Sequence, residues 1–222
     1  SNLFPDSFAN SNLGQIPKGW EVVQLADLVK NISRGISPKY SDKEEYPVIN
    51  QKCIRDSLIN FSLCKFTDYK KNMESKFLSR FDVLVNSMGV GTLGRVALFI
   101  HYDKNVLVDG CVSFIRGKTE DYSLFIYQNL SLREKEIINL STGSTGQTSL
   151  SKESLLKMEF IKPGEKIIER FSYLIRDFYI QRNKNIIQNN YIMSLRDTLL
   201  PKLISGELRI PDAEKMIEEA GI

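Results

Sequence analysis

Residues 165–204, EKIIERFSYLIRDFYIQRNKNIIQNNYIMSLRDTLLPKLI, decide the architecture, because this stretch contains no glycine and its apolar residues recur in one register. The spacings alternate between four and three, which is the pattern of a coiled-coil helix face. A helix of this length extends about 60 Å at roughly 1.5 Å per residue, more than a compact domain of this size needs. The pattern therefore predicts a long, projecting helix that pairs with another helix.

The pairing face of this helix has two apolar ends and a polar middle. Polar side chains weaken a coiled coil but penalise wrong registers, because a misaligned amide is buried without a hydrogen bond. The sequence thus predicts pairing specificity at some cost in stability. The candidate helix-pairing residues are Ile167, Phe171, Leu174, Phe178, Gln181, Asn185, Gln188, Ile192, Leu195 and Leu199.

The chain divides into four segments by composition. Gly206 is expected to end the long helix, and Pro211 to open a last short one. The predicted segments are a polar linker (1–16), a turn-rich mixed domain (17–161), the long coiled-coil helix (162–207) and a tail with a short helix (208–222).

The segment 17–161 predicts an α+β domain with a twisted sheet. Short runs rich in β-branched and aromatic residues indicate strands, and other stretches have helical character, one of them with Ser151 as a possible N-cap. The predicted strands are 46–50, 82–86, 95–100, 106–108 and 111–115, and the predicted helices are about 24–30, 122–132 and 151–156.

Composition limits the class of protein. No apolar run reaches the roughly 18 residues that a membrane span needs. The three cysteines form no CxxC pair, which is typical of a reducing cytoplasm. With the single His101 they are too few for a zinc site unless carboxylates help. We therefore expect a cytoplasmic protein without a metal, a cofactor or a membrane partner.

The positive charge is concentrated in one region. The whole chain carries a net charge of +3, whereas residues 30–80 hold eleven Lys and Arg against six Asp and Glu. Such a stretch can lie along phosphates and steer association with nucleic acid. Charge alone, however, favours the simpler interpretation of an ordinary solvated surface.

Two motifs suggest catalysis but lack the context that catalysis requires. Residues 89–94 match GxGxxG, yet the β-type run 95–100 follows where a dinucleotide site needs a helix. Asn86-Ser87-Met88 starts like an adenine-methyltransferase motif but lacks the Pro-Pro-aromatic that grips an extruded base. The glycines are better explained by a tight turn between strands, and binding is favoured over catalysis.

Four segments, taken in order, resemble the specificity subunits of type I restriction-modification systems. They are similar to the entry of that family's target recognition domain, its strand–Gly turn–strand, its Gly-Gln segment and the end of its long helix. These segments are 13–20 (LGQIPKGW), 78–96 (with DVLV and GTLG), 141–150 (STGSTGQTSL) and 196–208 (RDTLLPKLISGEL). The sequence departs from the family at Lys162-Pro163-Gly164, which puts the start of the helix in doubt.

The resemblance implies a non-catalytic, DNA-reading module. Family members carry two target recognition domains and two spacer helices, so this chain looks like the C-terminal half. The domain would read one part of a split sequence in double-stranded DNA. The helix would pair with the other half of the subunit or with a second copy. Methyltransferase subunits, which bring S-adenosylmethionine, and restriction/translocase subunits would be its partners.

Side chains that read bases are expected on loops of residues 17–161. In the major groove, Arg suits guanine, whereas Asn or Gln suits adenine. Each candidate also has a structural interpretation: Gln147 can bond main chain within its Gly-rich turn, and Arg95 can pair with a carboxylate. The candidates are Arg34, Lys39, Tyr40, Gln51, Lys52, Arg55, Asn86, Ser87, Arg95 and Gln147.

Two alternatives from other classes stay open. The chain can be a self-contained fragment of a DNA methyltransferase or nuclease, although it lacks the motifs. It can also be a coiled-coil adaptor without a DNA role, which a DNA-binding measurement separates from the main hypothesis.

Overall fold

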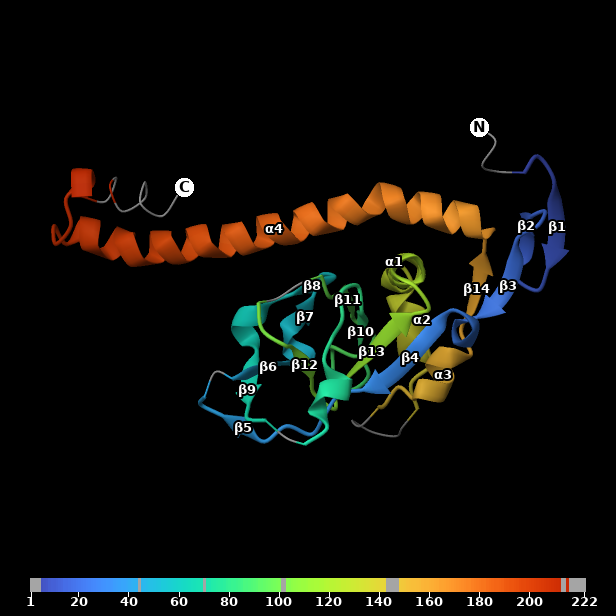
Figure 1. Cartoon of the computed structure of the whole chain (residues 1–222), viewed down its shortest axis with the longest axis horizontal. Helices are drawn as coiled ribbons and strands as arrows, with labels where there is room; N and C mark the ends of the chain where they lie inside the picture. The colour runs from blue at the N-terminus through green and yellow to red at the C-terminus, as the bar shows by residue number, and fades with distance from the viewer. Residues whose placement is uncertain are drawn as a thin grey trace. The chain divides into compact units, whose positions relative to one another are not determined.

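The computed structural model describes residues 5–43, 45–69, 71–100, 103–142, 148–212 and 215. It divides into two compact units, Ser1–Arg176 (unit 1) and Asp177–Ile222 (unit 2). Unit 1 contains all the strands that the structure describes and the start of a long helix, whose remainder belongs to unit 2 (Figure 1). None of the helices in the described ranges has an apolar stretch long enough for a bilayer.

The elements alternate between short strands and short helices until the long helix begins. The strands are β1 (Phe8–Ser11), β2 (Gly14–Pro17), β3 (Glu21–Gln24), β4 (Val29–Arg34), β5 (Tyr40–Ser41), β6 (Tyr46–Ile49), β7 (Ile54–Arg55), β8 (Leu58–Ile59), β9 (Lys65–Thr67), β10 (Val83–Asn86), β11 (Val96–Leu98), β12 (Leu107–Val108), β13 (Val112–Gly117) and β14 (Glu159–Lys162). The α-helices are α1 (Glu120–Ser131), α2 (Glu134–Asn139), α3 (Lys152–Leu156) and α4 (Glu165–Ile204). The 3-10 helices are η1 (Leu25–Asp27), η2 (Gln51–Cys53), η3 (Phe61–Leu63) and η4 (Met73–Lys76).

The centre of unit 1 is an antiparallel sheet in the order β11-β10-β13-β4. Every residue of β10 is buried, which explains why its sequence is a continuous apolar run rather than an alternating one. Helix α1 packs against β13 and β11 and buries Leu124, Ile126 and Leu130 (Figure 1). The expected α+β domain is therefore confirmed.

A second sheet, in the order β12-β6-β9-β5, shares the core of the first. Its strand β12 runs parallel to β6, whereas the other pairs are antiparallel. Ile49 at the end of β6 belongs to the same buried cluster as Leu84 of β10 and Phe114 of β13. Because the two sheets share this cluster, they pack as one core, and the loops that connect their strands start and end at fixed positions.

Residues 8–17 form a hairpin within the segment where a linker was expected. Strands β1 and β2 pair as a hairpin in which Ser11 faces Gly14. Gly14 has a φ of +98°, and the Ser11 hydroxyl donates to its carbonyl oxygen at 2.7 Å. The polar composition of this segment thus reflects an exposed hairpin with a tight turn.

One predicted helix is wrong, whereas all five predicted strands are confirmed within a few residues. Residues 24–30 contain only the single turn η1, and the chain then extends as β4. The reason is tertiary pairing: Ile32 of β4 lies opposite Ile115 of β13, and this sheet contact outweighs local helical preference.

Helix α4 is continuous over 40 residues, as the sequence predicts. It begins after Pro163 and Gly164, where Lys162 forms an ion pair with Glu165 at 2.7 Å. It ends before Gly206, whose φ of +75° is unfavourable for other residues and whose N–H donates to the Leu203 carbonyl. The short helix predicted in the tail lies mostly outside the described residues.

Candidate nucleic-acid interface

The turn between β10 and β11 is a rigid projection made by glycines. Gly89, Gly91 and Gly94 all have positive φ values, between +70° and +112°. The N–H of Leu93 donates to the Gly89 carbonyl and the N–H of Gly94 to that of Asn86, both at 2.9 Å. An antiparallel strand follows this GxGxxG match instead of a helix, which confirms that it is not a dinucleotide site.

Asn86 and Ser87 form the base of this turn and are fully buried. The Asn86 amide donates to the main-chain oxygens of Gln51 and Thr92, at 2.9 and 3.0 Å. The hydroxyls of Ser87 and Ser113 share a hydrogen bond of 2.6 Å. Both side chains therefore hold neighbouring segments together inside the protein. Because they are buried, we no longer assign them as base-reading residues.

Arg34 and Arg95 both bond to loop segments near this turn. The Arg34 guanidinium donates to the Ser149 hydroxyl at 2.7 Å and to the Leu150 carbonyl at 2.8 Å. The Arg95 guanidinium donates to the carbonyls of Ile54 and Gly91, at 3.1 and 2.9 Å. Since these donors are already engaged, the two arginines act as braces for loops rather than as free readers of guanine.

Tyr40 lies at the edge of the second sheet and is 42% exposed. Its hydroxyl bonds to the carboxylate of Asp109, and partial burial together with that negative charge raises the pKa of Tyr40 to about 12. The Lys65 ammonium lies over its ring, 4.7 Å from the centroid. Such cation–π contacts fix the direction of a lysine that sequence reasoning did not select.

The remaining candidates are exposed or close to the turn. Lys39, Lys52 and Arg55 are exposed, and Arg55 helps to line an open hollow of about 340 Å³ beside Arg95. Gln51 lies under Gly89, and its buried amide oxygen has no hydrogen-bond partner. Gln147 lies outside the described residues.

We group the exposed candidates with the turn as one candidate surface, which we call the turn face. It consists of Lys39, Tyr40, Gln51, Lys52, Arg55, Lys65 and the turn 89–94, braced by Arg34, Asn86, Arg95 and Asp109. Val90, at its tip, is 84% exposed and was also missed from the sequence. Lys65 and Val90 have no local sequence signal, because their positions depend on strand pairing and on the direction of a turn.

A close approach of two main chains lies beneath the turn face. The Gly35 N–H donates to the Val112 carbonyl at 3.0 Å, and the Ile36 N–H donates to the Val108 carbonyl at 2.9 Å. A Cβ atom at Gly35 would collide with the main-chain oxygens of Val108 and Asp109. The end of β4 therefore requires glycine at this position.

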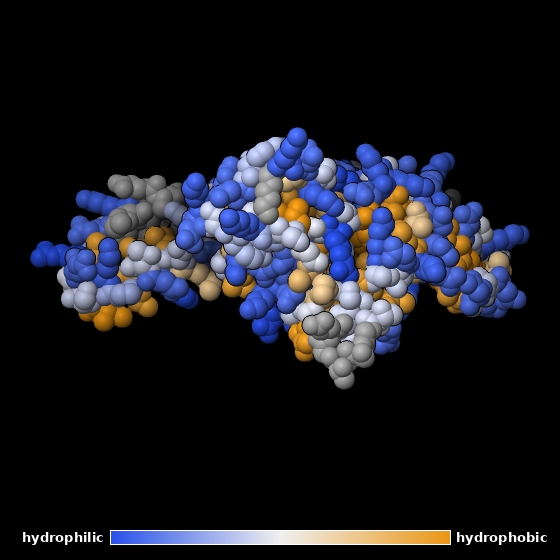
Figure 2. Space-filling model, turned by 90° about the horizontal axis from the view of Figure 1, so that it is seen from below, coloured by the Kyte–Doolittle hydropathy of each residue, from blue (hydrophilic) through white to orange (hydrophobic). Residues whose placement is uncertain are grey.

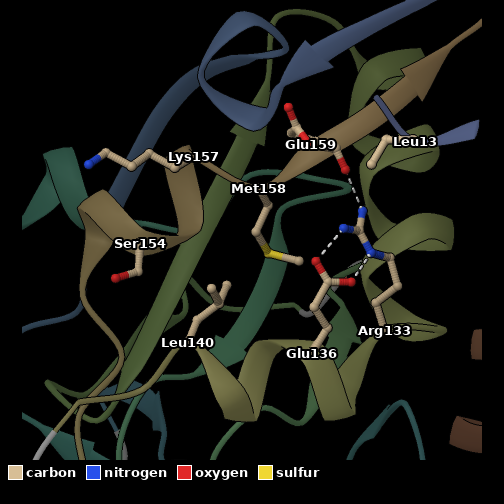
Figure 3. A pocket seen from close by; sticks show the side chains of 8 residues that line it. All are labelled: Leu13, Arg133, Glu136, Leu140, Ser154, Lys157, Met158 and Glu159. Carbon is tan, nitrogen blue, oxygen red and sulfur yellow. Dashed lines mark hydrogen bonds and ion pairs between the residues drawn. The ribbon is translucent and has the colours of Figure 1, made fainter. Parts of the chain in front are cut away.

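A second hollow, of about 260 Å³, lies between the β1–β2 turn, α2, α3 and β14 (Figure 3). Arg133 there forms a bidentate pair with Glu136, at 2.5 and 2.7 Å, and donates to the Glu159 carbonyl at 2.8 Å. Lys157 points away from this pair (Figure 3). The Arg133 guanidinium is therefore held by Glu136 and by the main chain of β14.

The surface has no feature of a metal site within the ranges that the structure describes. On the face seen in Figure 2, hydrophobic residues form separate patches between hydrophilic ones.

The first turns of α4 are attached to unit 1 by a face other than the predicted pairing face. Ile168 and Ser172 are buried, and the Ser172 hydroxyl donates to the Asp121 carbonyl at 3.1 Å. The Arg176 guanidinium pairs with the Asp121 carboxylate at 2.8 Å. These contacts with unit 1 are made by residues that are not part of the predicted pairing face.

The predicted pairing residues differ in exposure along the helix. Leu174, Phe178 and Ile192 are exposed by 51%, 75% and 41%, whereas Leu199 is already buried. The half-buried positions are Ile167, Phe171 and Leu195, and the exposed polar positions are Gln181, Asn185 and Gln188. Because Leu199 is covered, we remove it from the pairing face, which otherwise stays a prediction.

Known proteins resemble this chain in sequence and in fold. The HindI specificity subunit of Haemophilus influenzae, a type I restriction enzyme subunit, is 28% identical over 201 residues, covering 87% of this chain and 42% of the relative. The MjaIX specificity subunit of Methanocaldococcus jannaschii is 27% identical over 208 residues, covering 89% and 46%. The chain thus spans less than half the length of these curated relatives.

Solved structures support the fold. The type I restriction-modification S subunit of M. genitalium superimposes with a TM-score of 0.58 at 17% identity, covering 84% of this chain and 46% of the other. The HsdS subunit of Thermoanaerobacter tengcongensis gives a TM-score of 0.53 at 16% identity, covering 93% and 49%. A model of the type I restriction modification DNA specificity domain matches residues 17–189. Because this match covers most of the chain, the protein belongs to the family of type I restriction modification DNA specificity domains.

Proposed function

We propose that this chain reads one half of a two-part sequence in double-stranded DNA through its turn face. The observation that carries the proposal is the gathering of loops from separate segments around the turn 89–94. Lys39, Lys52 and Arg55 supply exposed positive charge there, while the exposed Val90 supplies an apolar contact at the tip of the turn. A DNA-reading surface needs both kinds of group, for phosphates and for base edges.

Each exposed group has a distinct task in this proposal. Lys39, Lys52 and Arg55 contact phosphates and set the register, since such contacts carry no sequence information. Tyr40 positions the Lys65 ammonium beside them. Val90 offers methyl groups at the tip of the turn, where they can meet the methyl group of thymine.

Charge reversal tests the surface. In one variant, Lys39, Lys52 and Arg55 are changed to Glu, and in a matched control the exposed Lys135, Lys152 and Lys166 are changed to Glu. We expect only the first variant to lose affinity, with the slope of log K against log salt falling by about 0.9 for each lost phosphate contact. Equal losses in both variants would mean that bulk charge matters and that the turn face is the wrong surface.

A domain transfer tests sequence reading itself. Residues 17–161 are moved into a related specificity subunit, and the modified sites are read from the methylated DNA of a strain that carries the chimera. The new sites should follow the transferred domain, because reading and spacing belong to different segments. A chimera that assembles, methylates and keeps its old sequence would contradict the proposal.

We further propose that α4 pairs with a second long helix, supplied by the other half of a full subunit or by a second copy. The exposure of Leu174 and Phe178 supports this, because isolated apolar side chains of this size gain free energy on burial. In a self-dimer the helices lie antiparallel and place the two reading domains at opposite ends. Methyltransferase and restriction/translocase subunits then dock on the assembly in the cytoplasm and supply the chemistry.

Self-pairing is tested by light scattering over a range of concentrations. Replacing Leu174 and Leu195 by Lys should give a folded monomer whose reading domain still binds DNA, whereas the unchanged chain dimerises. If the unchanged chain stays monomeric at high concentration, the self-pairing proposal fails and the partner is another chain. Methyl transfer to DNA by the isolated chain would instead support the alternative of an enzyme fragment.

A further inference from the structure

Two thiols face one another beside the turn face. The Sγ atoms of Cys53 and Cys64 are 3.9 Å apart. Cys53 is the last residue of η2 and is fully buried, whereas Cys64 directly follows η3 and is partly exposed. Cys64 is thus the less buried residue of the pair, although it also packs against the core.

The two 3-10 helices that carry these thiols are already fastened together. The Asn60 N–H donates to the Cys53 carbonyl at 2.8 Å, and the Asn50 side-chain amide donates to the Leu63 carbonyl at 3.1 Å. A disulfide requires the sulfurs to close to about 2.0 Å. Because the main chains are held side by side, only a small local shift is needed.

The surroundings divide the roles of the two sulfurs. The Cys64 thiol and the Asn50 N–H both donate to the Cys53 sulfur, which lowers the pKa of Cys53. The pKa of Cys64 is raised, because its proton is held by Cys53 and because it is partly buried. Cys53 is thus the readier thiolate, while Cys64 is the more accessible sulfur.

We propose that Cys53 and Cys64 form a thiol–disulfide site that reacts with low-molecular-weight disulfides and, when oxidised, weakens DNA binding by the turn face. The first part rests on the thiol geometry alone, and the second rests on the proposed function.

The reaction is a pair of balanced exchanges. The Cys64 thiol attacks one sulfur of the reagent RSSR as its proton passes to the adjacent Cys53 thiolate, which forms a mixed disulfide and releases RS⁻. Cys53 then gives that proton to the released RS⁻, and its thiolate attacks the Cys64 sulfur, forming the internal disulfide and releasing the second RS⁻. The two thiol protons end on the two released thiolates, so RSSR is reduced to two RSH while the cysteine pair is oxidised.

The link to DNA binding is the position of the closed ring. Arg55 lies inside the ring that a Cys53–Cys64 bond would close, and Lys52 immediately precedes it. As the Cys53 sulfur moves toward Cys64, it leaves the Asn50 N–H that it accepts from at 3.4 Å. Oxidation therefore shifts η2 and the two exposed cations that the turn face uses for phosphates.

Mass spectrometry of the full chain tests the site. The folded protein is incubated with glutathione disulfide, acid-quenched and alkylated. We expect a species two hydrogens lighter, with one free thiol in the unchanged chain and none in Cys111→Ser. Cys53→Ser should retain glutathione on Cys64, whereas Cys64→Ser should protect the buried Cys53. Three free thiols in the oxidised unchanged chain, or loss of the disulfide in Cys111→Ser, would overturn the site.

A second measurement tests the link to DNA, with Cys111→Ser as the background to leave only the pair. Binding to a mixed-sequence duplex should be several-fold weaker after oxidation and should recover with dithiothreitol, whereas the added Cys64→Ser change should abolish the redox response. Equal affinity in both states overturns the link. Absence of DNA binding in both states counts against the proposed function, while the mass data still decide the thiol site.

Discussion

The sheet of unit 1 and the long helix use the same residue type in opposite ways. Phe114 in β13 is fully buried among residues of both sheets, whereas Phe178 in α4 is 75% exposed. The sheet therefore completes its own apolar contacts within the chain. The helix leaves part of its apolar face exposed to solvent. Burying that face against a second helix would therefore lower the free energy.

The largest expected effect comes from truncating these two phenylalanines. Phe114→Ala should lower the free energy of unfolding by about 3–5 kcal/mol, because it removes buried contacts and leaves a cavity. Phe178→Ala should leave the stability of a monomer nearly unchanged but weaken association. Urea unfolding and light scattering measure the two quantities. Similar losses of stability at low protein concentration would show that Phe178 is covered within the chain and would break the comparison.

A smaller effect is expected in the polar middle of the helix, where the Gln181 amide donates to the Asn185 side-chain oxygen at 2.9 Å. Asn185→Leu should stabilise the paired state by about 1 kcal/mol, which corresponds to a rise in Tm of roughly 2–4 °C. It should also broaden the range of oligomers. Asn190→Leu, an exposed position off the pairing face, is the control. A less stable Asn185→Leu protein would refute a specificity role for the polar middle.

The smallest effect belongs to the junction of the sheet and the helix. The Glu165 carboxylate accepts hydrogen bonds from Lys162, at 2.7 Å, and from the Tyr122 hydroxyl, at 2.5 Å. These two contacts, that of Lys162 first, lower the pKa of Glu165 below its ordinary value of 4.5. A lowered carboxyl pKa gives stability that is present above the unfolded value and is lost as the pH falls through the folded value.

Glu165→Gln should therefore cost a few tenths of a kcal/mol at about pH 7, since the group is exposed, and almost nothing at about pH 3. Urea midpoints at the two pH values measure this difference. Glu169→Gln, one turn later on the exposed side, should show no such dependence. A cost that persists undiminished at the lower pH would point to packing instead of charge.

The same contrast explains what the sequence could predict. The strands of the core and the full length of α4 have strong local periodicity, and both were found from it. Asn86 was misplaced because a polar residue after a strand usually lies in an exposed loop, whereas here it bonds the main chains of two other segments from inside. Lys65 was missed because it approaches Tyr40 through the pairing of β5 with β9, which no local pattern reveals.

The main-chain approach at Gly35 bears on how new specificities can arise. Under the proposed function, the exposed side chains of the turn face select the DNA, and exchanging them leaves the framework beneath in place. Position 35 tolerates no side chain at all, because the oxygens of Val108 and Asp109 occupy the space. A library that randomises the exposed side chains should therefore keep Gly35 constant, since variants at this position would be lost to misfolding before any selection on DNA.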